Sequence, residues 1–286
     1  MRLLNAQSFY PEGPLQLGGD ILYTEYSRDR VLRHDGTRNV LVWEQAGAGP
    51  CALIPDQTGN LLACCYAANA VIRLTPDGRR IESIDRDIDG RAFSGPNDIT
   101  TDGGGGHYFT SSGVFDLAAP RDGRVYHLTA DGRARLVAAG IHFANGLAFD
   151  PARRRLLVNA HLAGEVLAFD AAPDGSLGAA RRFQKLPLPP QVPLAAAGYV
   201  GGDGMKIDPQ GRIINAQFGG GRLLISDAAG EVLGQIDIPV PYVTNVNFTA
   251  DPDRLVVTGM SDGWSAPFPG LVGLVSLADM RPPVPS

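Results

Sequence analysis

The sequence contains few cysteines and no long apolar segment. Three cysteines occur among 286 residues, and two of them are the neighbours Cys64 and Cys65. Such a small set does not form a disulfide framework, so a reducing cytoplasm is the expected compartment. No apolar run approaches the roughly 20 residues of a membrane span, and the first residues lack the apolar core of a signal peptide. We therefore expect a cytoplasmic protein that is not a membrane protein.

An excess of positive charge is also lacking. The 25 Lys and Arg residues are outnumbered by 30 Asp and Glu residues, which gives a net charge of −5. Nucleic acids and anionic membranes attract proteins through basic surfaces, so neither is an expected partner. Apolar residues, by contrast, make up 44% of the chain, and 36 Gly and 22 Pro are present. This composition is typical of a globular protein with a sizeable core and many tight turns.

One hairpin-like unit recurs six times along the chain. Its clearest copy, residues 141–161, has two apolar runs joined by a turn at Asp150-Pro151. The residues that open the six copies are Glu12, Cys51, Asn97, Asn145, Asp203 and Asn245. Repeats of roughly 40 to 50 residues built from short strands are typical of propeller blades. The sequence therefore predicts an all-β protein, a six-bladed β-propeller that occupies residues 1–286 as a single domain.

The two ends of the chain each leave one strand without a partner in this repeat. Residues 2–9 precede the first hairpin, and residues 271–277 follow the last one. Pairing these two strands would close the ring and remove its exposed sheet edges. Two longer segments, 111–122 and 186–202, interrupt the blades and are expected to be loops, a common place for functional residues.

The six opening residues predict a site at one mouth of the central channel. In an antiparallel hairpin the start of the first strand and the end of the second lie at the same end. Five of the six opening side chains carry oxygen atoms, and burying them without a partner is unfavourable. A hard divalent cation would satisfy these oxygens; hydrogen bonds among the residues or with water are the alternative.

A second set of residues is expected to form the rim of this mouth. It consists of the residues at the ends of the second strands, which are Tyr26, Tyr66, Ser112, His161, Phe218 and Met260. His161 is a candidate proton shuttle because histidine titrates near neutral pH, although it could also be a simple hydrogen-bonding residue. Cys51 has no obvious base beside it in the repeat and is interpreted as a residue that lines the pocket.

Several short motifs at blade spacing resemble one known family. They are Glu12-Gly13-Pro14, Gly95-Pro96-Asn97-Asp98, Ala144-Asn145-Gly146-Leu147-Ala148-Phe149 and Gly202-Asp203-Gly204. Together they resemble the senescence marker protein/gluconolactonase/luciferin-regenerating enzyme family of six-bladed propellers. The resemblance implies one divalent cation (Ca, Zn, Mg, Mn or Fe) bound by Glu12, Asn145 and Asp203. It also implies that Asn97 contacts substrate or a metal-bound water.

From these features we expect a metal-dependent hydrolase that opens a lactone with a metal-activated water. Asp203 is the first candidate to take the proton of that water, and His161 is the second. The residues expected to contact substrate are Asn97, Gly95, Cys51, Tyr26, Tyr66, Phe218, Asn245 and Met260. The alternatives are a non-hydrolytic propeller enzyme of the strictosidine-synthase kind, and a propeller that binds a small ligand or a protein without catalysis.

The sequence also contains an indication of substrate class. Sugar-lactone members of the family often place Arg or Ser where this chain has Gly95. The expected rim is largely aromatic, and Trp264 and Phe268 add to it in the last blade. Such a pocket favours apolar ligands, so we expect less polar or aromatic lactones and esters to be preferred over aldonolactones.

Overall fold

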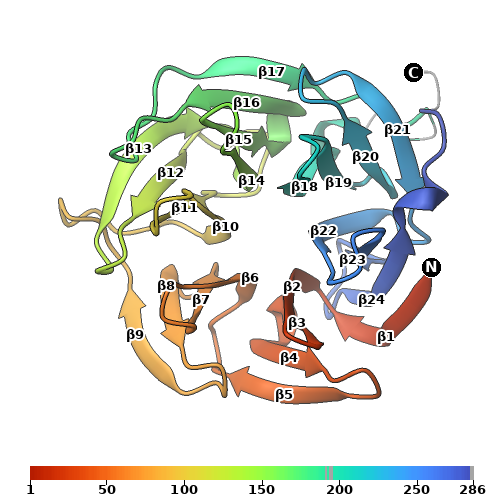
Figure 1. Ribbon diagram of the computed structural model, residues 1–286, viewed down its shortest axis with the longest axis horizontal. Helices are drawn as coiled ribbons and strands as arrows, with labels where there is room; N and C mark the ends of the chain where they lie inside the picture. The colour runs from red at the N-terminus through yellow and green to blue at the C-terminus, as the bar shows by residue number, and fades with distance from the viewer. Residues whose placement is uncertain (191, 193–195, 284–286) are drawn as a thin grey trace.

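Six four-stranded antiparallel sheets surround a central channel in the computed structural model, which describes residues 1–190, 192 and 196–283 (Figure 1). Blade one contains β2 (Pro11–Leu17), β3 (Asp20–Glu25), β4 (Arg30–His34) and β5 (Asn39–Glu44). Blade two contains β6 (Pro50–Pro55), β7 (Leu61–Cys65), β8 (Ala70–Leu74) and β9 (Arg80–Ile84). Blade three contains β10 (Pro96–Thr101), β11 (His107–Ser111), β12 (Gly123–Leu128) and β13 (Ala134–Ile141).

The second half of the ring repeats this arrangement. Blade four contains β14 (Ala144–Asp150), β15 (Arg155–Ala160), β16 (Glu165–Asp170) and β17 (Arg181–Lys185). Blade five contains β18 (Gly201–Ile207), β19 (Ile213–Phe218), β20 (Arg222–Ser226) and β21 (Val232–Asp237). Blade six contains β22 (Tyr242–Phe248), β23 (Arg254–Met260), β24 (Pro269–Ser276) and β1 (Arg2–Phe9). The all-β, six-bladed architecture predicted from the repeat is confirmed, and each blade also has an outermost strand.

The helical segments are single 3-10 turns. They are η1 (Tyr26–Arg28), η2 (His161–Ala163), η3 (Ala197–Tyr199) and η4 (Leu277–Asp279). Within the described ranges, none of the helices has the length and apolar composition needed to cross a membrane.

The ring closes through its two ends, as the sequence predicts. β1 is antiparallel to β24, with Arg2 opposite Leu274 and Phe9 opposite Pro269, and Figure 1 shows the two strands side by side. The Ser8 hydroxyl also donates a 2.6 Å hydrogen bond to Glu25 of β3, which joins the last blade to the first. This closure protects sheet edges that would otherwise be free to pair with other chains.

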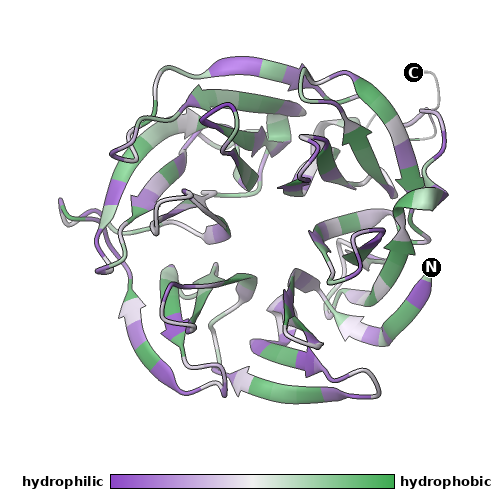
Figure 2. Cartoon of the chain, in the orientation of Figure 1, coloured by the Kyte–Doolittle hydropathy of each residue, from purple (hydrophilic) through white to green (hydrophobic). Residues whose placement is uncertain are grey.

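The hydrophobic core lies between neighbouring blades. One buried cluster joins Leu22 and Val31 of blade one to Leu61 and Ile72 of blade two, and similar clusters join the later blades. In Figure 2 the middle strands are coloured mainly as hydrophobic, while the outer strands alternate between hydrophobic and hydrophilic residues. Sheets buried on both faces are therefore packed around the channel, and they hold the innermost strands rigidly in place.

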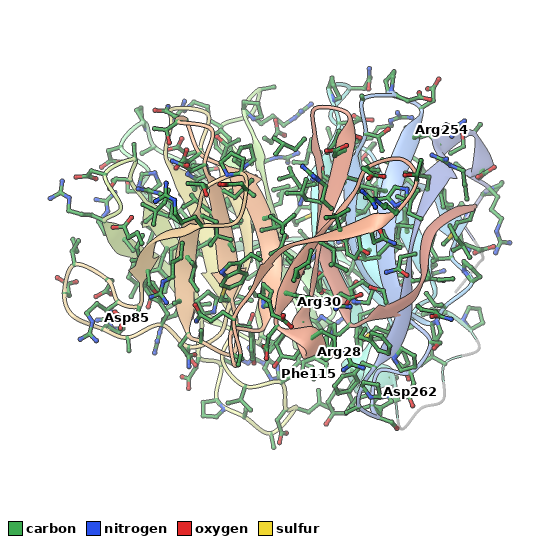
Figure 3. All side chains as sticks on the ribbon, turned by 90° about the horizontal axis from the view of Figure 1, so that it is seen from below. Arg28, Arg30, Asp85, Phe115, Arg254 and Asp262 are labelled. Atoms are coloured by element: carbon green, nitrogen blue, oxygen red, sulfur yellow. The ribbon has the colours of Figure 1, made fainter. Side chains whose placement is uncertain are left out.

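Three connecting segments lie at one end of the ring: the loop between β11 and β12, the η3 turn before β18, and the connection between β23 and β24. Phe115 lies in the loop between β11 and β12, and its ring centroid is 5.6 Å from that of Tyr199 in η3. Figure 3 shows Phe115 and Asp262 at this end and Arg254, at the start of β23, at the opposite end. Since β23 runs from Arg254 to Met260, the second strands end at the same mouth where the innermost strands begin.

Candidate functional site

The innermost strands are interrupted by register shifts at the residues that open the repeat. The pairing of β14 with β15 shifts between Ala144 and Leu147, on either side of Asn145. The β18–β19 pairing likewise shifts between Gly202 and Met205, on either side of Asp203. A bulge removes a residue from the regular pairing and redirects its side chain. The irregular strand openings thus place polar side chains in the channel mouth instead of between the blades.

A glycine after the bulged residue lets neighbouring strands approach closely. A Cβ atom on Gly146 would lie 1.9 Å from the carbonyl oxygen of Asp203 on the next blade. Any larger residue would therefore force β14 and β18 apart. The Asn-Gly pair of the motif brings Asn145 and Asp203 together in the same part of the mouth.

Two buried carboxylates form the acidic centre of the site. Glu12 and Asp203 are each 4% exposed. Burial raises the pKa of Glu12 to about 8; the charge of Asp98 adds to this effect, and the amide of Asn245, 3.1 Å from Glu12 Oε2, opposes it. Burial and the charge of Glu12 also raise the pKa of Asp203 well above its ordinary value. The site thus concentrates negative charge that would be stabilised by a bound cation.

Asn145 has an oxygen available for a ligand. Its Nδ2 donates to His161 Nδ1 at 3.2 Å, while Oδ1 is buried and has no hydrogen-bond partner among the described residues. A buried amide oxygen without a partner is unfavourable and indicates a missing ligand or water. Asn145 is therefore oriented to offer a neutral oxygen beside the two carboxylates.

His161 holds this orientation through both of its ring nitrogens. Its Nε2 lies 3.2 Å from the carbonyl oxygen of Tyr199, so Nε2 carries the proton and Nδ1 accepts from Asn145. Burial lowers the pKa of His161 to about 4, although the hydrogen bonds to the backbone of Tyr199 and Gly202 oppose the change. A neutral imidazole with both nitrogens engaged suits a structural hydrogen-bonding role better than proton transfer at neutral pH.

These groups face a cavity of about 370 Å³ at the channel mouth. Six residues predicted from the sequence to belong to the site line this cavity and form what we call its floor. They are Glu12, Cys51, Asn97, Asn145, His161 and Asp203. The Cys51 thiol is 3.6 Å from the carbonyl oxygen of Gly49, and burial raises its pKa. This environment disfavours a reactive thiolate and agrees with a lining role for Cys51.

The walls of the cavity are aromatic. They consist of Tyr10, Tyr26, Tyr66, Phe115, Phe143, Phe218, Trp264 and Phe268. Tyr26, Tyr66 and Phe218 were expected at the rim. Phe115 was not singled out, although it lies in segment 111–122, which was expected to be a loop of possible functional importance. Tyr10 and Phe143 were also missed, although each stands two residues before an opening residue of the repeat, a signal that a search at that position would have found.

Three residues expected to contact substrate lie outside the cavity lining. Met260 is fully buried, and the amide of Asn245 donates a hydrogen bond to Glu12. Gly95 makes room for an aromatic wall, because a Cβ there would lie 2.5 Å from the Tyr66 ring. Gly95 and Asn245 thus shape the site from behind the residues that face the cavity.

Asp98 is a further buried acid that the sequence did not single out. Its Oδ1 accepts from the backbone of Ile99 at 2.8 Å, and the ammonium group of Lys206 lies 4.0 Å from its Oδ2. Burial raises the pKa of Asp98, and the charge of Lys206 acts in the opposite direction. Its position next to a motif asparagine was the available signal, but burial of the side chain is a tertiary property.

The candidate ligands are oxygen atoms. In the parts of the chain that the structure describes, no three His, Cys, Asp or Glu side chains come close enough to hold a metal ion. Cys51 therefore does not complete a ligand set with Glu12 and Asp203. The residues that could hold a cation are these two carboxylates together with the amide oxygen of Asn145, which suit a hard divalent cation.

Comparisons with known proteins show the family to which the chain is similar. Residues 11–261 match the family model described as the SMP-30/Gluconolactonase/LRE-like region. The chain is 32% identical over 217 residues to pentonolactonase XacC of Haloferax volcanii, a match that covers 73% of this chain and 67% of that protein. It is 26% identical over 202 residues to the gluconolactonase of Zymomonas mobilis, covering 68% of this chain and 55% of that protein.

Among solved structures, the gluconolactonase XC5397 from Xanthomonas campestris superimposes with a TM-score of 0.74. The two chains are 25% identical, and the match covers 96% of this chain and 89% of the other. The similarity thus extends around nearly the whole ring.

Proposed function

Because the chain belongs to the SMP-30/gluconolactonase/LRE-like family, we propose that it is a lactonase whose site binds one divalent cation through Glu12, Asn145 and Asp203. One observation carries this proposal: two buried carboxylates and a buried amide oxygen without a partner meet on one cavity. Such a set is unfavourable without a partner and fits the oxygen coordination of a hard cation. Calcium, magnesium or manganese suit it better than zinc, which prefers nitrogen and sulfur.

A bound cation would supply positive charge that polarises the ester carbonyl and acidifies water. The protein's own groups would then direct the reaction. Asp203 would orient the attacking water and accept its proton, and Asn97 on the cavity floor would donate a hydrogen bond to substrate. His161 would keep the Asn145 amide correctly turned, and the aromatic walls would exclude bulk water and so strengthen these polar interactions.

The aromatic walls support a proposal about substrate class. Every hydroxyl of a sugar-like lactone that enters such a cavity gives up hydrogen bonds with water, at a cost of about 1–3 kcal/mol for each group left unpaired. An aryl or alkyl lactone instead gains about 25 cal/mol for each Å² of apolar surface buried. We therefore propose that less polar or aromatic lactones are preferred over aldonolactones.

The test is to measure kcat/KM for dihydrocoumarin, an alkyl lactone and gluconolactone with the same metal-loaded sample. The proposal predicts the highest value for one of the first two. A clear lead for gluconolactone would contradict the substrate assignment but not the lactonase activity. Tight binding of these compounds without any turnover would instead support a ligand-binding propeller.

A further inference from the structure

One position of the blade repeat adopts an unusual backbone conformation. It stands two residues before the opening residue, and in blades one to four it is occupied by Tyr10, Gly49, Gly95 and Phe143. Their φ angles are 50°, 54°, 66° and 57°, all in the left-handed region. Glycine adopts this region without strain, whereas a bulky side chain rarely does. Tyr10 and Phe143 therefore occupy positions where glycine would fit more easily.

The strained backbone of Tyr10 is held from both sides. Its N–H donates to the carbonyl oxygen of Phe268 at 2.8 Å, and its own carbonyl accepts from Tyr26 at 3.0 Å. Its ring packs against the rings of the same two residues, with centroid distances of 5.4 Å and 4.9 Å. Strain that the surrounding structure maintains in this way is typical of functional sites. It is a reason to ask what the Tyr10 side chain does in the cavity.

The Tyr10 hydroxyl is a hydrogen-bond donor without a protein acceptor. Tyr10 lines the cavity, and its hydroxyl makes no hydrogen bond to any residue that the structure describes. Tyr66 differs, because its hydroxyl donates to the carbonyl oxygen of Gly113 at 2.6 Å. The phenol of an ordinary tyrosine titrates at about pH 10, so the group carries its proton at neutral pH. The group is available to donate to a substrate oxygen beside the carboxylates.

Other polar groups on the cavity floor are less suited to this task. Both nitrogens of His161 are engaged, and the Cys51 thiol faces the carbonyl oxygen of Gly49. The carboxylates of Glu12 and Asp203 are acceptors when ionised. Asn97 and Tyr26 also line the cavity with groups that can donate. Tyr10 differs from them because it directly precedes β2, the strand that carries Glu12.

We propose that the Tyr10 hydroxyl donates a hydrogen bond to the ring oxygen of the lactone as its bond to the carbonyl carbon breaks. This proposal rests on the proposed lactonase function. In the reaction, water adds to the carbonyl carbon, the ring C–O bond breaks, and the ring oxygen ends as a hydroxyl whose proton comes from that water. The phenol keeps its own proton and stabilises the negative charge that develops on the leaving oxygen.

The test is the substitution Tyr10→Phe, assayed on two lactones that differ in their leaving oxygen. In δ-valerolactone the leaving oxygen is an alkoxide and needs the hydrogen bond, whereas in dihydrocoumarin it is a phenolate that leaves more easily. We expect kcat/KM to fall about 10- to 100-fold for δ-valerolactone and less than about 3-fold for dihydrocoumarin. The melting temperature and the cation affinity should not change.

Tyr108→Phe is the matched control, because Tyr108 is buried in blade three and does not line the cavity; it should leave both activities unchanged. If Tyr10→Phe lowered kcat/KM equally for both lactones, or for neither, the assignment of the hydrogen bond to the ring oxygen would be overturned. If the metal-loaded wild-type protein hydrolysed neither these two lactones nor any other lactone tested, the proposed lactonase function would be rejected, and the Tyr10 proposal would be rejected with it.

Discussion

At the scale of single residues, Glu12 and Asp203 both have a raised pKa and make the metal-free site sensitive to pH, and the effect of Glu12 can be worked out. Its pKa in the folded protein is raised from 4.5 to about 8, chiefly by burial. Between these values the folded protein keeps a proton that the unfolded chain releases, so the folded state binds more protons. The resulting stabilisation is complete below about pH 4.5 and is lost as the pH rises through about 8.

We therefore expect the melting temperature of chelator-treated protein to fall between pH 6 and pH 8 because of Glu12. Cation binding needs the ionised carboxylate, so the stabilisation by added cation should be larger at pH 8 than at pH 6. Thermal unfolding with and without cation measures both effects. Glu12→Gln is the matched control, and its metal-free melting temperature should depend less on pH. A wild-type melting temperature that rises over this range would contradict the account.

His161 offers a second test at this scale. Replacing it by Phe keeps a ring among Phe115, Phe143 and Phe218 but removes the acceptor for the Asn145 amide. We expect cation affinity, measured by calorimetry, to fall about 10- to 100-fold, as for other residues that orient a metal ligand. The pH profile of kcat at saturating cation should not change. A collapse of kcat with normal cation affinity would instead make His161 a proton shuttle.

The sequence was most informative where side chains with oxygen atoms recur at one repeat position. The repeat pointed to all six residues that open the blades, and the resemblance to the family then singled out Glu12, Asn145 and Asp203 among them. The role of His161 depends on which atoms its two nitrogens meet, and Tyr199, one of these partners, is 38 residues away. Contacts of this kind are properties of the folded chain and leave no periodic trace in the sequence.

At the scale of structural elements, the loop between β11 and β12 shapes the entrance to the cavity. Phe115 on this loop has its ring 4.9 Å from Phe143 and 5.9 Å from Phe218, between centroids. The loop thus carries an aromatic group across to two other blades. Tyr66 supports it by a hydrogen bond to Gly113.

We expect Phe115→Ala to raise KM for dihydrocoumarin about 10-fold, because the substrate then buries less apolar surface. The kcat and the cation affinity should change little, since the acidic centre is untouched. The matched control is Val114→Ala, which alters a neighbouring side chain that is 65% exposed and outside the cavity. A loss of kcat with an unchanged KM would argue against a binding role for Phe115.

The outermost strands of the blades could not be predicted from the sequence. The inner three strands of most blades were visible as apolar runs, but β9 (RIESI) has no fully buried residue, and β5 (NVLVWE) has one. Such mixed strands form because a neighbouring strand offers hydrogen bonds, not because of their own apolar pattern. The bulges at the strand openings could not be predicted from the sequence either, because they are shifts in the register of strand pairing.

At the scale of the whole molecule, contacts between β1 and the first blade add to the β1–β24 pairing that closes the ring. Ser8 donates to Glu25, which also receives Arg30 at 2.7 Å. This buried network links the N-terminal strand of blade six to blade one. The pairing of the chain ends was predicted from the two strands left over in the repeat, whereas the polar network was not.

We expect Ser8→Ala to lower the free energy of unfolding by about 2 kcal/mol, because a buried carboxylate loses one hydrogen bond. Denaturant unfolding measures the change. Gln7→Ala, on the exposed face of the same strand, should change it by less than about 0.5 kcal/mol. Equal effects of the two substitutions would show that Ser8 does not help to close the ring.

The most direct test of the whole account is a cation titration of chelator-treated protein, followed by calorimetry and by lactone hydrolysis in the same samples. We predict that one equivalent of a divalent cation binds and that turnover returns in proportion to the cation bound. Asp203→Asn should lose both properties. Asp122→Asn, which replaces an exposed acid in the loop between β11 and β12, should keep both. Full turnover without cation, or wild-type cation binding by Asp203→Asn, would contradict the account.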